Sequence, residues 1–234
     1  MPEERAPKSS GDDVPVLSVD RLTVRRGANL VLDAISLDVE AGTPYAIVGE
    51  SGAGKTTLLS VVCGLLEPDS GEVKIRGRSL AGLEPRERAV QVGLVFQDHQ
   101  LFPHMTALEN VTLAPRLRGA KNADEAGRAL FASLGLAGFE GRRPHEMSGG
   151  QKQRVAIARA LALEPHVVLF DEPSAALDPK TTRDLAELLM GLADKRQIVV
   201  VSHDQPFVEQ CCPRGVRLEK GKVGVLGDAA AIFG

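Results

Sequence analysis

A glycine-rich segment, GESGAGKT at Gly49–Thr56, limits what this chain can fold into more than any other feature of its sequence. It satisfies the pattern G-x-x-x-x-G-K-[ST], follows the apolar run PYAIVG and begins a predicted helix that ends near Gly64. Glycines allow a tight loop whose backbone N–H groups converge on phosphate oxygens, and the following helix adds its positive end. Lys55 can reach the β and γ phosphates, and the Thr56 hydroxyl can ligate Mg²⁺. This context favours nucleotide binding over a plain glycine-rich turn.

The length and charge of the chain fit a single α/β core with an appended subdomain. The 234 residues carry a net charge of −3, which gives no positive field for nucleic acid. The three scattered cysteines argue against a disulfide framework or a zinc site and suit a reducing cytoplasm. Residues 1–15 are polar and predict a disordered tail rather than a signal peptide. The apolar stretches are far shorter than the ~20 residues that a membrane-spanning helix needs.

The pattern of predicted elements changes twice along the chain. Residues 16–96 are rich in short strands, whereas residues 98–163 are predicted to be helical. In the helical part, three pairs match the capping box that begins a helix: Thr106 with Glu109, Asn122 with Glu125, and Ser148 with Gln151. After residue 163, continuous apolar strands alternate with helices again, which indicates a parallel sheet covered on both faces.

Two predicted buried strands end in residues that can carry chemistry. VVLFDE places Asp171 and Glu172 at the carboxyl end of one strand, and VVVSHD places His203 at the end of another. Ligands collect at that edge of an open parallel sheet. We therefore expect Asp171 to hold Mg²⁺, Glu172 to polarise an attacking water and His203 to contact the γ-phosphate. An exposed helix-capping pair and an ordinary loop histidine are the alternatives.

The segment MSGGQ, at 147–151, predicts a second helix start suited to an anion. Ser148 and Gln151 satisfy a capping box, but the two glycines beside the serine leave backbone amides uncovered, which stability alone does not require. The segment can therefore be a plain capping box, an anion-binding helix start, or both at once.

Taken in order, GESGAGKTT, Gln97 in VFQDHQLFP, MSGGQ, LFDEP, SAALD and VVVSHD resemble the nucleotide-binding subunits of ATP-binding-cassette (ABC) transporters. The resemblance extends from about Leu17 to Gly227. It implies a P-loop NTPase core with a mainly parallel sheet, an N-terminal antiparallel β subdomain and an inserted helical subdomain at about 98–163. The ABC ATPase domain as a whole would span residues 16–234.

The resemblance also implies a site shared by two chains, with ATP and Mg²⁺ as its ligands. One chain would hold the nucleotide through Gly49, Glu50, Ser51, Gly52, Ala53, Gly54, Lys55, Thr56 and Thr57. The other chain would add Ser148, Gly149, Gly150 and Gln151 to the γ-phosphate, and Asp178 would act across the dimer. The metal would be held by Thr56, Gln97 and Asp171, and the catalytic residues would be Lys55, Gln97, Glu172 and His203.

Three positions depart from the pattern of the family. Arg26 stands where an aromatic side chain usually stacks on adenine, although a guanidinium plane can stack instead. Ala175 replaces a serine in the loop that crosses the dimer, which removes a hydroxyl contact. Met147 replaces a leucine with little change in apolar volume.

The partners implied by the resemblance are a second ABC subunit, as a homodimer, and integral membrane permease subunits. Residues 101–115 resemble the matching segment of bacterial importers of polar amino acids, which would add a periplasmic solute-binding protein. The expected location is peripheral, on the cytoplasmic face of the inner membrane. Alternatives are an exporter or lipoprotein-release ATPase, and a soluble ABC ATPase without transport. The short interval before MSGGQ and the single cassette argue against the repair and translation classes of the soluble group.

Overall fold

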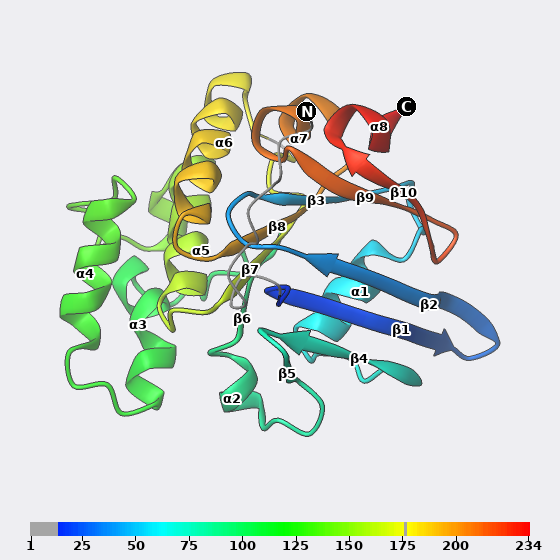
Figure 1. The fold of residues 1–234 in the computed structure, drawn as a ribbon. Coiled ribbons are helices and arrows are strands. Elements are labelled where there is room, and N and C mark those ends of the chain that lie inside the picture. The colour runs from blue at the N-terminus through cyan, green and yellow to red at the C-terminus, as the bar shows by residue number, and fades with distance from the viewer. Residues whose placement is uncertain (1–13, 176) are drawn as a thin grey trace, which may run out of the picture.

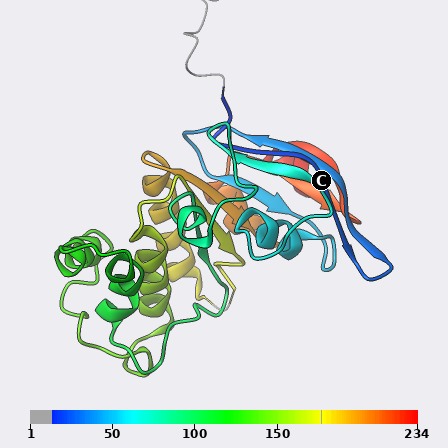
Figure 2. The same ribbon diagram turned by 90° about the horizontal axis from the view of Figure 1, so that it is seen from below.

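The computed structural model describes residues 14–175 and 177–234. Most of the predicted tail, residues 1–13, lies outside this range. Two sheets lie on one side of the molecule and a group of helices lies on the other (Figures 1 and 2). Within the described residues, no helix combines the length and apolar character that a bilayer crossing requires.

The larger sheet has six strands in the order β10-β9-β3-β8-β7-β6, and all are parallel except β10. Its strands are β3 (Tyr45–Val48), β6 (Val92–Val95), β7 (Val167–Asp171), β8 (Gln197–Val201), β9 (Arg214–Glu219) and β10 (Lys222–Asp228). The central strands are buried along almost their whole length, as continuous apolar runs in a covered parallel sheet should be. Ile47 and Asp171 both pair with Val201, so the loops after β3, β7 and β8 emerge at one edge.

The smaller sheet is antiparallel, with the order β2-β1-β4-β5. It consists of β1 (Leu17–Arg26), β2 (Asn29–Val39), β4 (Ser70–Ile75) and β5 (Arg78–Ser79). Helix α1 (Lys55–Val62) contributes Leu58, Leu59 and Val62 to one apolar cluster that contains residues of both sheets. The helix that follows the glycine-rich loop is therefore fixed between two sheets (Figure 1).

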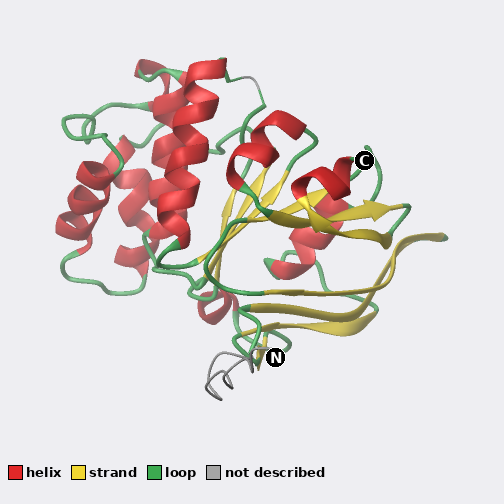
Figure 3. Ribbon diagram, turned by 45° about the horizontal axis from the view of Figure 1, so that its top comes forward, coloured by secondary structure: helices red, strands yellow, loops and turns green. Residues whose placement is uncertain are grey.

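Most of the remaining helices lie on the other side of the parallel sheet, either against it or packed beyond α5 (Figure 3). They are α3 (Ala107–Leu117), α4 (Ala123–Ser133), α5 (Gly149–Leu161), α6 (Pro179–Ala193), α7 (Gln205–Cys211), α8 (Ala229–Phe233) and the short 3₁₀ turn η1 (Pro144–Glu146). Apolar residues of α3, α4, α5, α6 and α7 share one core with β7 and β8. Helices α3 and α4 pack together and against α5 at the far side from the antiparallel sheet (Figure 2).

Two of the three predicted capping boxes are confirmed. Thr106 and Glu109 exchange hydrogen bonds of 3.2 and 2.7 Å, and Ser148 and Gln151 exchange bonds of 3.3 and 2.9 Å. The predicted box at Asn122 is wrong, because its side chain makes no cap hydrogen bond. Its backbone, at φ −104° and ψ 21°, is not extended, whereas an extended N-cap residue is what lets the side chain reach back to the N–H groups of the first turn.

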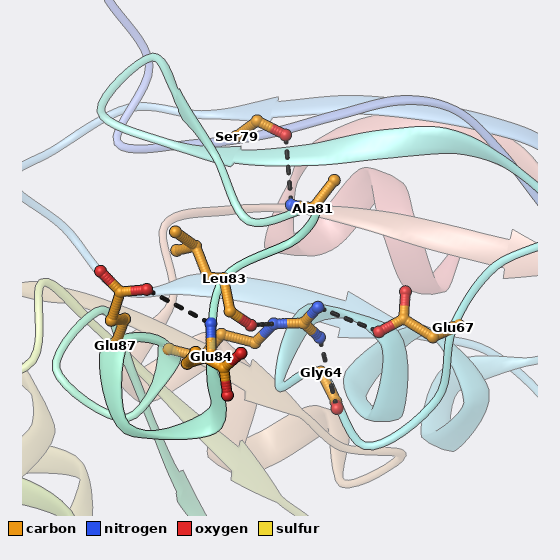
Figure 4. Close-up of polar contacts among 8 residues, drawn as sticks. Gly64, Glu67, Ser79, Ala81, Leu83, Glu84 and Glu87 are labelled. Carbon is orange, nitrogen blue, oxygen red and sulfur yellow. Dashed lines mark hydrogen bonds and ion pairs between the residues drawn. The ribbon is translucent and has the colours of Figure 1, made fainter.

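The sequence patterns did not predict α2 (Pro85–Arg88), which connects the antiparallel sheet to β6. Arg88 donates to the carbonyls of Leu83 and Gly64 at 3.1 and 3.4 Å and to the carboxylate of Glu67 at 2.9 Å (Figure 4). Gly64 has φ +70°, and a Cβ there would lie 2.3 Å from Nη1 of Arg88. The glycine thus admits the guanidinium that ties α2 to the end of α1.

Candidate functional site

A pocket of about 570 Å³ lies at the carboxyl edge of the parallel sheet, where the loops after β3, β7 and β8 meet. It is lined by Val31, Gly49, Glu50, Ser51, Gly52, Gly54, Lys55, Thr56, Thr57, Gln97, Asp171, Glu172 and His203. Four segments that are far apart in the sequence thus bring together every predicted catalytic and metal-binding side chain. The predicted loop residue Ala53 is the exception among Gly49–Thr57: it is buried and lines a different pocket behind the loop.

The glycine-rich loop has a backbone that other residues cannot easily adopt. Gly49 and Gly54 have φ angles of +148° and +104°. A Cβ on Gly49 would lie 2.4 Å from the carbonyl oxygen of Leu218, and one on Gly54 would lie 2.6 Å from Cδ2 of Leu32. Both glycines are therefore required by conformation and by close packing. They hold the loop where its N–H groups can surround an anion at the start of α1.

Lys55 closes this loop from inside the pocket. Its ammonium donates to the carbonyl oxygens of Gly49 and Glu50 at 2.7 and 3.0 Å. A cation held over the loop by two backbone bonds is already close to the place where bound phosphate oxygens would lie. The side chain needs only to exchange carbonyl partners for phosphate partners.

Asp171 and Glu172 follow one another at the end of β7 but lie in different environments. Burial raises the pKa of Asp171, the neighbouring charge of Glu172 raises it further, and Lys55 partly opposes both effects. Glu172 has a φ of +48°, which is unusual for a residue with a side chain, and its N–H donates to the carbonyl of Val201 at 2.8 Å. Such a backbone persists only when its surroundings hold it, and it is often found at functional sites.

His203 fixes the carboxylate of Glu172 from the end of β8. Its Nδ1 lies 2.9 Å from Oε2 of Glu172, and its backbone N–H donates to the same oxygen at 3.3 Å. The Glu172 side chain is 16% exposed, whereas that of His203 is 74% exposed. One carboxylate oxygen is thus engaged by the histidine loop, which leaves the other oxygen for a reacting group in the pocket.

The donor atoms in the pocket suit Mg²⁺. Thr56, Gln97 and Asp171 offer a hydroxyl, an amide oxygen and a carboxylate, which are hard oxygen ligands. Among the described residues, no three His, Cys, Asp or Glu side chains form a metal-binding group. A site with one carboxylate matches a metal that is shared with substrate phosphates, and a cation would relieve the repulsion between Asp171 and Glu172.

The predicted residues at the start of α5 lie outside this pocket. Ser148, Gly149, Gly150 and Gln151 are not among its lining residues, and Ser148 and Gly149 are exposed. Gly149 lines a neighbouring pocket of about 530 Å³ together with Gln97. Asp178 caps α6 by accepting from the N–H groups of Lys180 and Thr181 and from the Thr181 hydroxyl. Hydrogen bonds from Thr181 lower the pKa of Asp178.

Arg26, which stands where the family usually has an aromatic residue, lies away from the pocket, and Val31 lines it. Arg26 pairs with Asn29 at the tip of the β1–β2 hairpin, is exposed and does not line the pocket. Val31, on β2, lines it instead. No sequence pattern indicates Val31, because its position depends on how β2 lies against the loop at Gly221, whose carbonyl accepts from Asp33 N. Met147 is buried, in agreement with its apolar role.

Comparison with known proteins gives a consistent set of relatives. The ABC transporter family model matches residues 32–175. The chain is 39% identical to the L-cystine transport system ATP-binding protein TcyN of Escherichia coli, over 93% of this chain and 92% of that protein. It is 41% identical to the glutamine transport ATP-binding protein GlnQ of Escherichia coli, over 88% and 89%. It is 43% identical to the sulfate/thiosulfate import ATP-binding protein CysA of Burkholderia mallei, but it spans only 64% of that protein.

A solved structure gives the same result for the fold. The dimeric ATP-binding cassette MJ0796, in a post-hydrolysis state with ADP and phosphate, matches with a TM-score of 0.80 and 32% identity, over 91% of this chain and 98% of that one. The expected fold class is thereby confirmed, with its mainly parallel core, antiparallel sheet and helices. The pocket of about 570 Å³, which we call the phosphate pocket, the order of the motifs and these relatives together lead to one conclusion. The chain belongs to the ABC transporter family, as an ATP-binding subunit that hydrolyses ATP to drive transport.

Proposed function

We propose that two copies of this chain bind two ATP molecules at shared sites and power the import of polar amino acids through membrane permease subunits. The observation that carries the proposal is the separation, within one chain, of two helix starts that are each suited to an anion. The phosphate pocket contains Lys55, Glu172 and His203, whereas the start of α5 lies outside it. A head-to-tail pair would bring Ser148–Gln151 of one copy to the γ-phosphate held by the other. The dimeric state of the related cassette supports this arrangement.

Binding depends on the loop and its lysine. In the proposal the N–H groups of Gly49–Thr57 surround the β and γ phosphates, and Lys55 leaves the Gly49 and Glu50 carbonyls to contact their oxygens. Thr56, Gln97 and Asp171 would hold Mg²⁺. That ion would offset phosphate charge and help to orient the γ-phosphoryl group.

Cleavage depends on Glu172. With one oxygen held by His203, its carboxylate can accept a hydrogen bond from a water in line with the bond to the leaving phosphate. The water oxygen forms the new bond to the γ-phosphorus, the bond to the β-phosphate oxygen breaks, and ADP leaves with the electron pair. Lys55, His203 and the α5 amides of the second copy stabilise the charge on the phosphoryl oxygens.

Coupling to the membrane would pass through Gln97 and the helices beyond it. Gln97 lines the phosphate pocket and also the neighbouring pocket next to Gly149, so it can respond to the γ-phosphate and to α5 at once. Residues 101–115, the segment that resembles importers of polar amino acids, begin four residues after Gln97 and include most of α3. We place the contact with permease subunits there, with the chain peripheral on the cytoplasmic face of the inner membrane. A periplasmic solute-binding protein would deliver the substrate.

Uptake of radiolabelled compounds by cells tests the proposed substrate class. A strain that lacks this chain should lose uptake of labelled L-cystine or L-glutamine, and the wild-type chain should restore it while Glu172→Gln should not. Labelled sulfate serves as the competing substrate, because the sulfate/thiosulfate import protein CysA is also a relative, at 43% identity over 64% of its length. If only sulfate uptake is lost, sulfate replaces polar amino acids as the proposed substrate class. Unchanged uptake of all three, with an intact ATPase, would favour an exporter or a soluble ATPase.

A further inference from the structure

The segment after β6 turns sharply between the phosphate pocket and α5. His99 and Gln100 are consecutive residues with side chains, and their φ angles are +63° and +44°. L-residues seldom adopt this left-handed conformation, and two in a row need support from their surroundings. Gln97, two residues before this turn, lines the phosphate pocket. The turn is thus separated by a single residue from a side chain that lines the phosphate pocket.

Arg159, in the last turn of α5, provides that support. Its Nη1 donates to the carbonyl of Gln100 at 2.6 Å, and its Nη2 donates to the carbonyl of His99 at 2.8 Å. Burial lowers the pKa of Arg159, and no ion pair to a carboxylate forms among the described residues. Two of the N–H donors of the guanidinium thus bind the backbone of this turn, while Asp98, whose charge partly opposes the effect of burial on the pKa of Arg159, forms no ion pair with it.

The other end of the same helix faces the same segment. Gly149, in the first turn of α5, and Gln97 both line the pocket of about 530 Å³ beside the phosphate site. Farther along, Gly93 of β6 allows the backbone of α5 to approach closely, since a Cβ there would lie 2.8 Å from the carbonyl of Ala160. Helix α5 therefore contacts the chain before and after Gln97.

We propose that Arg159 is a positioning residue for ATP hydrolysis: it clamps the His99–Gln100 turn to α5 and thereby places Gln97 at the phosphate pocket. The inference rests on the proposed role of Gln97 and adds a residue to it. The helix that offers Ser148–Gln151 to one nucleotide would then also set the Gln97 of its own chain. A lysine cannot replace Arg159, because a single ammonium cannot match two carbonyls in the fixed planar geometry of a guanidinium.

Arg154 offers a matched control on the same helix. Its Nη1 donates to the carbonyl of Leu134, at the end of α4, at 2.9 Å. It is also a partly buried arginine bound to a backbone carbonyl, but it lies away from the turn. Arg154→Lys should therefore report the general cost of removing such a bond from α5.

A double-mutant cycle tests the proposal on the full chain with MgATP. Arg159→Lys should lower kcat by about tenfold or more with little change in KM, as a displaced catalytic group does. In the Gln97→Ala background, the same substitution should lower kcat by less than about twofold, because the group it positions is gone. Arg154→Lys should leave kcat within about twofold in both backgrounds. If Arg159→Lys does not stay folded, Arg159→Gln, which keeps one donor, takes its place.

The outcomes separate the two levels of the argument. Equal losses from Arg159→Lys with and without Gln97, or equal effects of Arg159→Lys and Arg154→Lys, would overturn the clamp and leave the ATPase intact. A wild-type chain that does not hydrolyse ATP, alone or with its permease, would overturn the proposed function itself.

Discussion

In the part of the chain that the structure describes, the N-termini of α1 and α5 are both suited to phosphate, and they are built in opposite ways. The start of α1 lies in a concave pocket, where glycines with left-handed φ angles and the ammonium of Lys55 surround the space in which we expect the anion to bind. The start of α5 is exposed, and the Ser148–Gln151 capping box already satisfies part of its backbone. A helix dipole is common to both, but only the first has the concavity and the cation that make a complete site. The second gains a phosphate only if another molecule brings one.

Glu172→Gln, in the phosphate pocket, should have the largest effect on ATP hydrolysis. The amide keeps the size and polarity of the side chain but loses the negative charge that orients the attacking water. We expect turnover to fall on the order of 10³-fold, within the usual range for a general base. ATP binding should persist, and analytical ultracentrifugation should show a stable dimer with ATP. Normal steady-state hydrolysis in this variant would remove Glu172 from its proposed role.

Ser148→Arg tests the exposed helix start. The bulky cation should block its approach to a phosphate held by another copy, so hydrolysis should fall at least about 100-fold. The phosphate pocket of the same chain is separate, so ATP affinity of the monomer, measured by fluorescent-nucleotide titration, should stay within about twofold. Ser148→Ala is the control for the lost cap, which alone costs about 1 kcal/mol of stability. Equal loss of binding and hydrolysis would argue against a shared site.

Alanine substitutions at one glycine of each helix start should differ in their effect on stability. Gly54→Ala places a Cβ 2.6 Å from Leu32 at a φ of +104°, so we expect a loss of about 1–3 kcal/mol and weaker ATP binding. Gly149→Ala meets no atom within 4 Å, and its unfolding free energy should change by less than about 1 kcal/mol. Urea unfolding and ATPase rates measure both. A Gly149→Ala chain that is stable but slow would mean that this glycine serves the approach of phosphate; wild-type rates would leave it without that role.

The pocket could be predicted from the sequence further than the rest of the molecule. Lys55, Asp171 and His203 each follow a buried apolar strand, and parallel strands must end at one edge, so their convergence follows from local patterns. The failed cap at Asn122 and the position of Arg26 depended on backbone conformation and strand packing that residue types do not reveal. The Arg159 clamp joins residues about 60 positions apart, and no spacing rule connects them.

Asp171→Asn should have the smallest effect on stability and the clearest dependence on pH. Since the folded protein raises the pKa of Asp171, it binds more protons than the unfolded chain above the ordinary pKa of 3.8. The free energy of unfolding therefore falls as pH rises through that range and stays lower at neutral pH.

The neutral amide removes this cost, so without nucleotide or Mg²⁺ the variant should melt about 2 °C higher than wild type at pH 7, a small gain because solvent screens a partly buried carboxylate. Below the ordinary pKa the difference should vanish. With MgATP the order should reverse, because the wild-type carboxylate then has a cation beside it and the amide binds that cation more weakly. Calorimetry of both proteins at pH 7 and below pH 3.8, with and without MgATP, measures these melting temperatures. A variant that melts lower than wild type in the absence of ligand would contradict this prediction. It would mean that the charged carboxylate of Asp171 stabilises the ligand-free fold instead of destabilising it.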